Sequence, residues 1–165
     1  MLNLRGAVMS IELVKQYMKT FGRENDVMEF DVSSATVALA AEALDVEPCR
    51  IAKTLSFKKD DGCILVVTAG DVKIDNAKYK HTFGLKAKML TADEAVELIG
   101  HAVGGVCPFA VKETVNGIYI DESVKRFENI FPACGSSNSA IELTPDELFE
   151  LSKATNWVDV TKLTE

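Results

Sequence analysis

Apolar residues recur at helical spacing in two segments near the start of the chain. The first segment predicts a helix that begins at Ser10 and is ended by Gly22. Its apolar face consists of Ile11, Val14, Met18 and Phe21. The second segment predicts a helix capped by Ser33 or Ser34. Its apolar face consists of Val37, Ala40, Ala41 and Leu44.

The middle of the chain carries the strongest strand signals. Residues 64–68 (ILVVT) form a β-branched apolar run with the length of a fully buried strand. Residues 53–57 form a second extended segment, which follows a short helix at Pro48. The turn at residues 60–62 (DDG) joins these two segments and predicts a β-hairpin. Further strands are expected at residues 27–30, 117–121, 128–131 and 140–143.

Two capping boxes predict helices later in the chain. They are residues 91–94 (TADE) and 144–147 (TPDE), and the proline of the second box stands at the first helical position. Another helix is expected around residues 74–80. Strands and helices alternate irregularly, which argues against a doubly wound nucleotide-binding fold. The pattern therefore predicts one mixed α/β domain with a mixed or largely antiparallel sheet.

The composition is that of one folded domain. The chain has 165 residues, of which 47% are hydrophobic and 26% charged, and this length is enough to bury a substantial core. No apolar run approaches the ~20 residues that span a bilayer, and the N-terminus lacks the pattern of a secretory signal. The four cysteines form no Cys-x-x-Cys pair, which disfavours a zinc knuckle or a thioredoxin-like motif. We therefore expect a cytoplasmic protein with no membrane partner.

The net charge of −7 is unevenly distributed along the chain. Residues 50–90 carry nine Lys and Arg against four Asp and Glu, whereas residues 1–49 and 91–165 are both acidic. Phosphate neutralisation supplies most of the affinity of nucleic-acid binders, so this chain is not expected to bind nucleic acid over its whole surface. The basic middle segment could either hold phosphates locally or form ordinary solvated surface.

The usual catalytic motifs do not occur in the sequence. It contains no GxGxxG, GxxxxGK[ST], GxSxG or HExxH motif, and no carboxylate pair stands out for acid–base work. His81 and His101 have no neighbouring ligand pattern, so core or surface roles are favoured over a metal site. A nucleophilic Cys107 would need a base and an electropositive setting, and packing in the core is the favoured interpretation.

Two features remain as candidates for binding chemistry. Lys53 stands in the otherwise apolar stretch 51–57, where a lysine either reaches solvent or points into a cleft as a fixed cation. Such a cation suits a phosphate or a developing oxyanion. Gly104 and Gly105 have no Cβ atoms, so their backbone can approach a ligand closely or form an anion-binding nest. The alternative for this pair is a tight turn, stiffened by Pro108.

Five segments in order resemble the YbaK/EbsC family, which includes the editing domain of bacterial prolyl-tRNA synthetases and its free-standing homologues. Lys53 matches the signature lysine of the family, and residues 104–109 match its GG-x-x-P loop. The resemblance runs from about residue 26 to 160 and leaves residues 1–25 as an N-terminal helical extension. It implies a single α/β domain with a mixed, partly barrel-like sheet and surrounding helices. The other matching segments are residues 34–44, which count as one segment with residues 51–55 around Lys53, residues 64–70, the lysine-rich stretch that ends at residues 90–94, and residues 135–148.

The resemblance also implies a function, which is hydrolysis in trans of the ester in mischarged aminoacyl-tRNA at the 3′ CCA end. It gives catalytic roles to Lys53, which would hold the terminal adenosine or its phosphate, and to Gly104 and Gly105 beside the aminoacyl carbonyl. A positioned water and the ribose hydroxyl would carry out the attack. The implied partners are aminoacyl-tRNA and a synthetase, without metal or cofactor. Further residues expected at the substrate are Phe30, Thr54, Val106, Cys107, Pro108, Gly135 and Ser136.

Two departures from the family pattern leave the substrate open. Residues 135–138 (GSSN) stand where members acting on Cys-tRNA(Pro) often carry a basic G-x-R-G type loop, and Cys107 stands where small polar residues are common. Cysteine, alanine, serine and proline esters therefore stay open, as do the tRNA and the oligomeric state. Two alternatives remain: a non-catalytic module that binds tRNA ends or a synthetase, and a hydrolase of another small acyl ester or thioester that uses Cys107.

Overall fold

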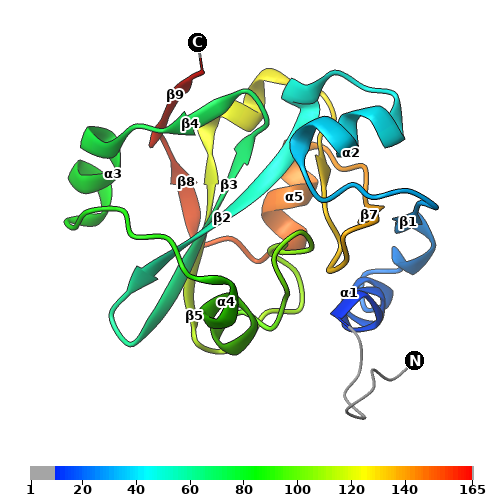
Figure 1. Cartoon of the computed structure of the whole chain (residues 1–165), viewed down its shortest axis with the longest axis horizontal. Helices are drawn as coiled ribbons and strands as arrows, with labels where there is room; N and C mark the ends of the chain where they lie inside the picture. The colour runs from blue at the N-terminus through cyan, green and yellow to red at the C-terminus, as the bar shows by residue number, and fades with distance from the viewer. Residues whose placement is uncertain (1–9, 165) are drawn as a thin grey trace.

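A five-stranded mixed sheet forms the centre of the computed structural model, which describes residues 10–164 (Figure 1). Strands β2 and β3 pair antiparallel, and every other neighbouring pair in this sheet is parallel. The fold is therefore a single α/β domain with a mixed sheet, as the sequence predicts. In spatial order the strands are β6 (Phe131–Pro132), β2 (Ile51–Lys59), β3 (Gly62–Ala69), β5 (Val115–Asp121) and β8 (Asn156–Val158).

The hairpin of β2 and β3 confirms the strongest strand prediction. Lys59 pairs with Gly62, so Asp60 and Asp61 form the two-residue turn. Asp60 adopts the left-handed conformation, with φ of 55°, which an aspartate tolerates better than most residues. Every residue of β3 is buried, as expected for its continuous apolar run.

Helices cover both faces of the sheet, which explains why β3 is apolar at consecutive positions. Leu65 and Val67 pack into the main core with α1, α4 and α5, whereas Ile64 and Val66 pack into a second core with α3. The helices are α1 (Ser10–Lys19), α2 (Val37–Leu44), α3 (Asn76–Phe83), α4 (Ala92–Leu98) and α5 (Pro145–Leu151). Short 3₁₀ turns lie at Glu24–Asp26, Pro48–Arg50 and Glu122–Arg126. Within residues 10–164, none of these helices is long and apolar enough to cross a membrane.

The predicted helix starts are largely confirmed. Both capping boxes form, at α4 and α5. The described part of α1 runs from Ser10, the first residue that the structure describes. The prediction for α2 was wrong in its cap, because the Thr36 side chain accepts the bond from the Leu39 amide. Ser34 instead donates to the carbonyl of Ser137 on a distant loop. The helix predicted at residues 74–80 begins later, because Asp75 caps α3.

Two small sheets join segments that are far apart in sequence. β1 pairs antiparallel with β7, and β4 with β9. The short strands β4, β8 and β9 were not predicted, and the strands predicted at residues 128–131 and 140–143 overlap β6 and β7 by only one residue each. Beyond these, Ile130 and Leu143 form an isolated bridge. The strands of the small sheets are β1 (Met28–Glu29), β7 (Ser139–Ala140), β4 (Val72–Ile74) and β9 (Thr161–Leu163).

Candidate active site

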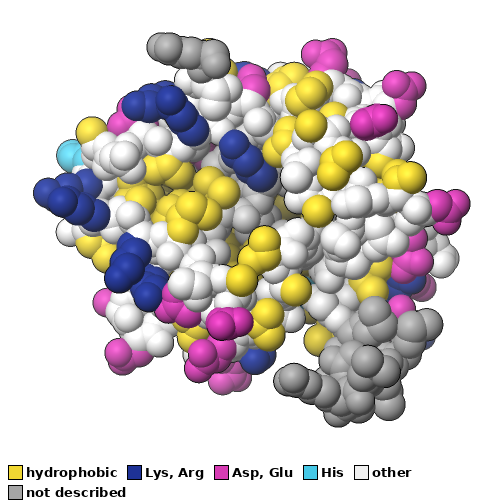
Figure 2. Space-filling view, viewed as in Figure 1, with side chains coloured by type: hydrophobic (Ala, Val, Ile, Leu, Met, Phe, Trp, Pro, Cys, Tyr) yellow, Lys and Arg dark blue, Asp and Glu magenta, His cyan; other side chains and the backbone are white. Residues whose placement is uncertain are grey.

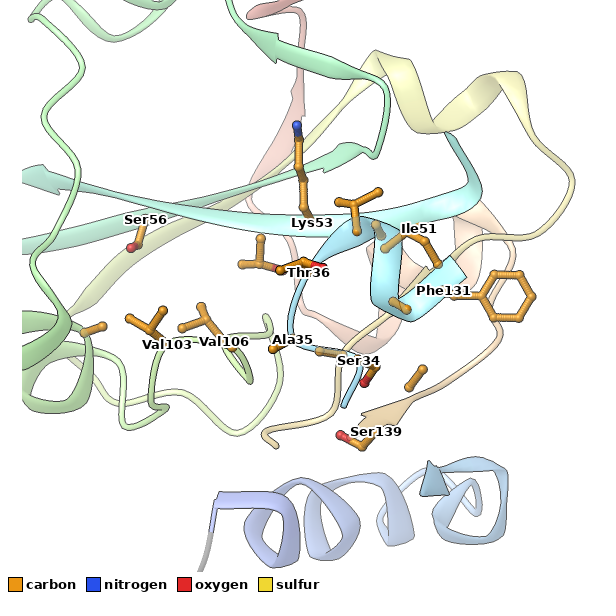
Figure 3. A pocket seen from close by; sticks show the side chains of 18 of the residues that line it. Ser34, Ala35, Thr36, Ile51, Lys53, Ser56, Val103, Val106, Phe131 and Ser139 are labelled. Carbon is orange, nitrogen blue, oxygen red and sulfur yellow. The ribbon is translucent and has the colours of Figure 1, made fainter. Parts of the chain in front are cut away.

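A pocket of about 210 Å³ lies where five separate segments meet, one of which is the stretch of Met89 and Leu90 that leads into α4 (Figure 3). The first half of β2 forms one wall, and the turn that enters α2 forms another. The loop around Gly104 and the segment of β6 and β7 complete the enclosure. The lining residues labelled in Figure 3 are Ser34, Ala35, Thr36, Ile51, Lys53, Ser56, Val103, Val106, Phe131 and Ser139.

Lys53 is the only charged residue among the described residues that line this pocket. Lys53 and Ser56 leave β2 on opposite sides, so the lysine lies at the edge of the pocket while Ser56 points toward Val103 and Val106 (Figure 3). The lysine ammonium donates to the backbone carbonyl of Val72. Its side chain is partly buried, and this burial lowers its pKa, an effect that the carboxylate of Asp71 opposes.

Thr54 contributes a polar group with no partner inside the described part of the chain. Its hydroxyl oxygen is buried and makes no hydrogen bond there, although Thr54 lines the pocket. A buried hydroxyl without a partner costs about 1–3 kcal/mol. The hydroxyls of Ser34 and Ser139 are already bonded to neighbouring loops. Thr54 is therefore a pocket residue whose hydroxyl leaves its hydrogen-bonding capacity unused within the described chain.

Two glycine loops pack against each other beside the pocket. Gly104 lines the pocket and has φ of +96°, a conformation that favours glycine. Gly105 lies behind it, where an added Cβ would stand 2.7 Å from the carbonyl carbon of Gly135 and from the amide nitrogen of Ser136. Gly135 has φ of +93° and abuts Ser10 of α1. Helix α1 and the two loops therefore form one packed unit.

The structure brings together only some of the predicted site residues. Lys53, Thr54, Gly104 and Val106 line the pocket. The others hold the surrounding loops in place or are buried behind them: Phe30, Gly105, Cys107, Pro108, Gly135 and Ser136. Sequence reasoning did not assign residues 34–36 to the site: Ser34 was interpreted as a possible helix cap, and residues 34–44 only as a segment of the family resemblance.

His101 and Cys107 form a buried pair behind the glycine loop. His101 Nε2 lies 2.7 Å from the carbonyl oxygen of Phe109, so this nitrogen carries the proton and Nδ1 accepts from the hydroxyl of Ser10. Cys107 Sγ lies 3.6 Å from Nε2. Burial raises the pKa of the Cys107 thiol to about 12 and lowers the pKa of His101. The pair is therefore neutral, and it joins the two ends of the glycine loop to α1.

We expect His101 to make the fold sensitive to acid. Because burial lowers its pKa below the ordinary value of about 6.5, the unfolded chain binds the proton more readily than the folded one. Its contribution is therefore complete above pH 6.5 and decreases as the pH falls. Urea unfolding at pH 7 and pH 5 measures this loss, which His101→Gln should reduce and the exposed-site control His81→Gln should not. An equal loss in wild type and His101→Gln would contradict the assignment.

The described residues contain no cluster of three or more His, Cys, Asp or Glu side chains that could hold a metal ion. The described residues that line the pocket also include no Asp, Glu or His. The chemistry available at the pocket is therefore that of one ammonium group, several hydroxyls and exposed backbone.

Comparisons with known sequences point to one family. The family model for the aminoacyl-tRNA editing domain matches residues 32–151. The chain is 54% identical over 155 residues to the uncharacterized protein YwhH of Bacillus subtilis (strain 168), a match that covers 93% of this chain and 98% of that protein. It is 35% identical over 95 residues to the proline–tRNA ligase of Bacillus pumilus (strain SAFR-032), which covers 57% of this chain but 17% of the ligase.

Two solved structures share the fold over nearly the whole chain. One is a protein proposed to be a trans-editing enzyme for prolyl-tRNA synthetase, with a TM-score of 0.83, 28% identity, and coverage of 93% of this chain and 97% of that one. The other is the hypothetical protein APE2540, with a TM-score of 0.79, 29% identity, and coverage of 91% and 99%.

Proposed function

Since the chain belongs to the aminoacyl-tRNA editing domain family, we propose that it is a free-standing deacylase that hydrolyses the ester of mischarged aminoacyl-tRNA at the 3′ CCA end. The observation that carries this proposal is a small pocket with one cation at its edge and a glycine loop on its wall. A volume of about 210 Å³ suits a small aminoacyl group better than a large ligand.

Each part of the pocket has a role in this proposal. Lys53 attracts the phosphate or the terminal ribose and so fixes the position of the ester. The backbone beside Gly104 lies close to the aminoacyl carbonyl, because no Cβ intervenes. The Thr54 hydroxyl, which has no hydrogen-bond partner within residues 10–164, hydrogen-bonds to the aminoacyl group. Editing by such a second site is needed because synthetase pockets separate similar small amino acids by only about 1–3 kcal/mol.

The proposed hydrolysis does not use a side chain as general base, since no carboxylate or imidazole lines the described pocket. A water oxygen attacks the ester carbonyl and forms the new C–O bond. The bond between the carbonyl carbon and the ribose oxygen breaks, and the ribose oxygen takes up a proton. The neighbouring ribose hydroxyl relays the proton from the attacking water, so the free amino acid and the uncharged tRNA are released.

A deacylation time course with a panel of aminoacyl-tRNAs tests this function. Alanyl- and cysteinyl-tRNA(Pro) come first, since the proline–tRNA ligases among the relatives point to that tRNA. Seryl- and prolyl-tRNA(Pro) complete the panel, and the reaction without protein gives the spontaneous rate. We expect faster release from at least one small aminoacyl ester. Release at the spontaneous rate from every ester, by protein that binds tRNA, would favour the non-catalytic binding module.

The burial of Cys107 argues against the alternative of a thiol-dependent hydrolase. Its side chain is fully buried and its raised pKa, about 12, leaves it a thiol at neutral pH. We expect iodoacetamide to modify the partly exposed Cys49 and to leave Cys107 unmodified in the folded protein, with deacylation unchanged. Peptide mass spectrometry locates the modification, and Cys49→Ser serves as control. Loss of activity with alkylation at Cys107 would instead support the thiol mechanism.

A further inference from the structure

The segment that runs from α3 to the start of α4 is strongly basic in an acidic protein. Residues 76–92 contain Lys78, Lys80, Lys86 and Lys88 and no Asp or Glu, whereas the whole chain has a net charge of −7. The space-filling view of this face shows Lys and Arg side chains around an apolar hollow on the side of α3 (Figure 2). Acidic side chains lie along the right-hand and lower edges of the same face. The basic charge is therefore concentrated on one side of the pocket.

Three of these lysines have no anionic partner within residues 10–164. Lys80, Lys86 and Lys88 are exposed and form no ion pair there, whereas Lys78 pairs with Asp159 and Lys58 with Glu94. An unpaired, solvated ammonium keeps its full charge for an external anion, and such contacts supply most of the affinity for nucleic-acid backbones. These three side chains, which we call the lysine strip, are available for binding.

The lysine strip is continuous with the pocket. The amide of Lys58 on β2 donates to the carbonyl of Lys88, and the amide of Leu90 donates to the carbonyl of Ser56. Met89 and Leu90 themselves line the pocket. The segment that carries Lys88 therefore runs along the edge of β2 directly into the pocket wall.

The remaining two lysines extend this path away from the pocket. Lys80 and Lys86 line a separate open hollow with Asn76, Ala77 and Ala87. Residues 86 and 88 lie outside any helix, and both side chains are exposed whereas the intervening Ala87 is partly buried. Lys86 and Lys88 are therefore both accessible to an external anion on this side of the molecule.

We propose that the RNA backbone next to the 3′ end crosses the lysine strip, with its phosphates on Lys80, Lys86 and Lys88, when the terminal ester occupies the pocket. This rests on the proposed function, because the pocket fixes where the 3′ end lies. Met89, which follows Lys88 and is 57% exposed at the pocket, offers an apolar surface on which a base can lie. Acidic side chains along the right-hand and lower edges of the same face would repel phosphates that approach from there.

The test measures binding separately from turnover. Fluorescence anisotropy with uncharged tRNA labelled at the elbow gives the affinity of wild type and of Lys80→Ala, Lys86→Ala and Lys88→Ala over a range of KCl concentrations. Each variant should bind several-fold more weakly and lower the slope of log K against log salt by about 0.7–0.9, the value for one lost phosphate contact. The matched control is Lys19→Ala on α1, which removes another exposed lysine without an ion pair in the described chain.

Turnover on two substrates separates the strip from the proposed function. The lysine variants should raise KM for aminoacyl-tRNA without lowering kcat, and leave hydrolysis of aminoacyl-adenosine unchanged. The proposal would be overturned if the three lysine variants bound tRNA as tightly as wild type does. It would also be overturned if Lys19→Ala weakened tRNA binding as much as they do. If wild type hydrolyses neither substrate, the deacylase function fails, yet the binding measurements still decide whether RNA crosses the strip.

Discussion

Replacing Lys53 by alanine is expected to reduce deacylation roughly 10²–10³-fold, the typical loss when one preorganised electrostatic contact is removed from an active site. Lys53 is the only charged residue among those described as lining the pocket, so no neighbouring group can replace its charge. If the lysine positions the ester during the reaction, the loss appears in kcat and not only in KM. Deacylation kinetics on the ester that wild type hydrolyses fastest measures both.

Two further variants test whether the charge of Lys53 is responsible. Lys53→Met keeps the apolar stem and should be as inactive as Lys53→Ala, without loss of thermal stability, because burial already disfavours the charged form and lowers the lysine pKa. The control is Lys58→Ala, which removes another lysine of β2. Lys58 forms an ion pair with Glu94, and the variant should retain activity. Normal hydrolysis by Lys53→Ala, or inactive Lys58→Ala, would refute the assigned role.

A methyl group at Gly105 is expected to destabilise the fold by about 1–3 kcal/mol and to disrupt the pocket. The added Cβ would lie 2.7–2.8 Å from three backbone atoms of Gly135 and Ser136, and backbone cannot move aside as a side-chain end can. One of the two loops must shift, and Gly104, which lines the pocket, would shift with it. Urea unfolding gives the free energy, and deacylation shows the effect on the pocket.

Gly22→Ala is the matched control for this substitution. Gly22 has φ of +72°, and an added Cβ there would meet no atom within 4 Å in the described chain. It should therefore cost about 1–2 kcal/mol in backbone strain alone and leave the catalytic rate unchanged. If Gly105→Ala were as active as Gly22→Ala, the close packing of the two loops would have no bearing on catalysis.

Features of the fold that depend on local sequence were predictable. The two capping boxes and the turn at residues 60–62 are complete within a few residues, and each forms as expected. The cap of α2 was mispredicted because Ser34 bonds to the distant Ser137, a competition that local sequence does not reveal. For the same reason β4 and β9 were missed: three-residue strands have too few positions to show alternation, and their pairing is set by the tertiary fold.

The candidate site was predictable only where one residue type is unusual in its context. Lys53 in an apolar strand and the glycine pair stand out in the sequence, and Lys53 and Gly104 do line the pocket. Ala35 and Phe131 also line it, but they look like ordinary packing residues in the sequence. The buried bond between His101 and Ser10 joins residues that no sequence pattern connects.

The parallel pairing of the central strands affects how fast the protein folds. Only the hairpin of β2 and β3 joins neighbours in sequence, whereas Cys63 pairs with Val115, Ile51 with Phe131, and Val72 with Leu163. Chains dominated by such long-range pairings fold in milliseconds to seconds, because long loops must close before the contacts form. The pocket draws its walls from the same distant segments, so during synthesis it cannot form before Ala140 has left the ribosome.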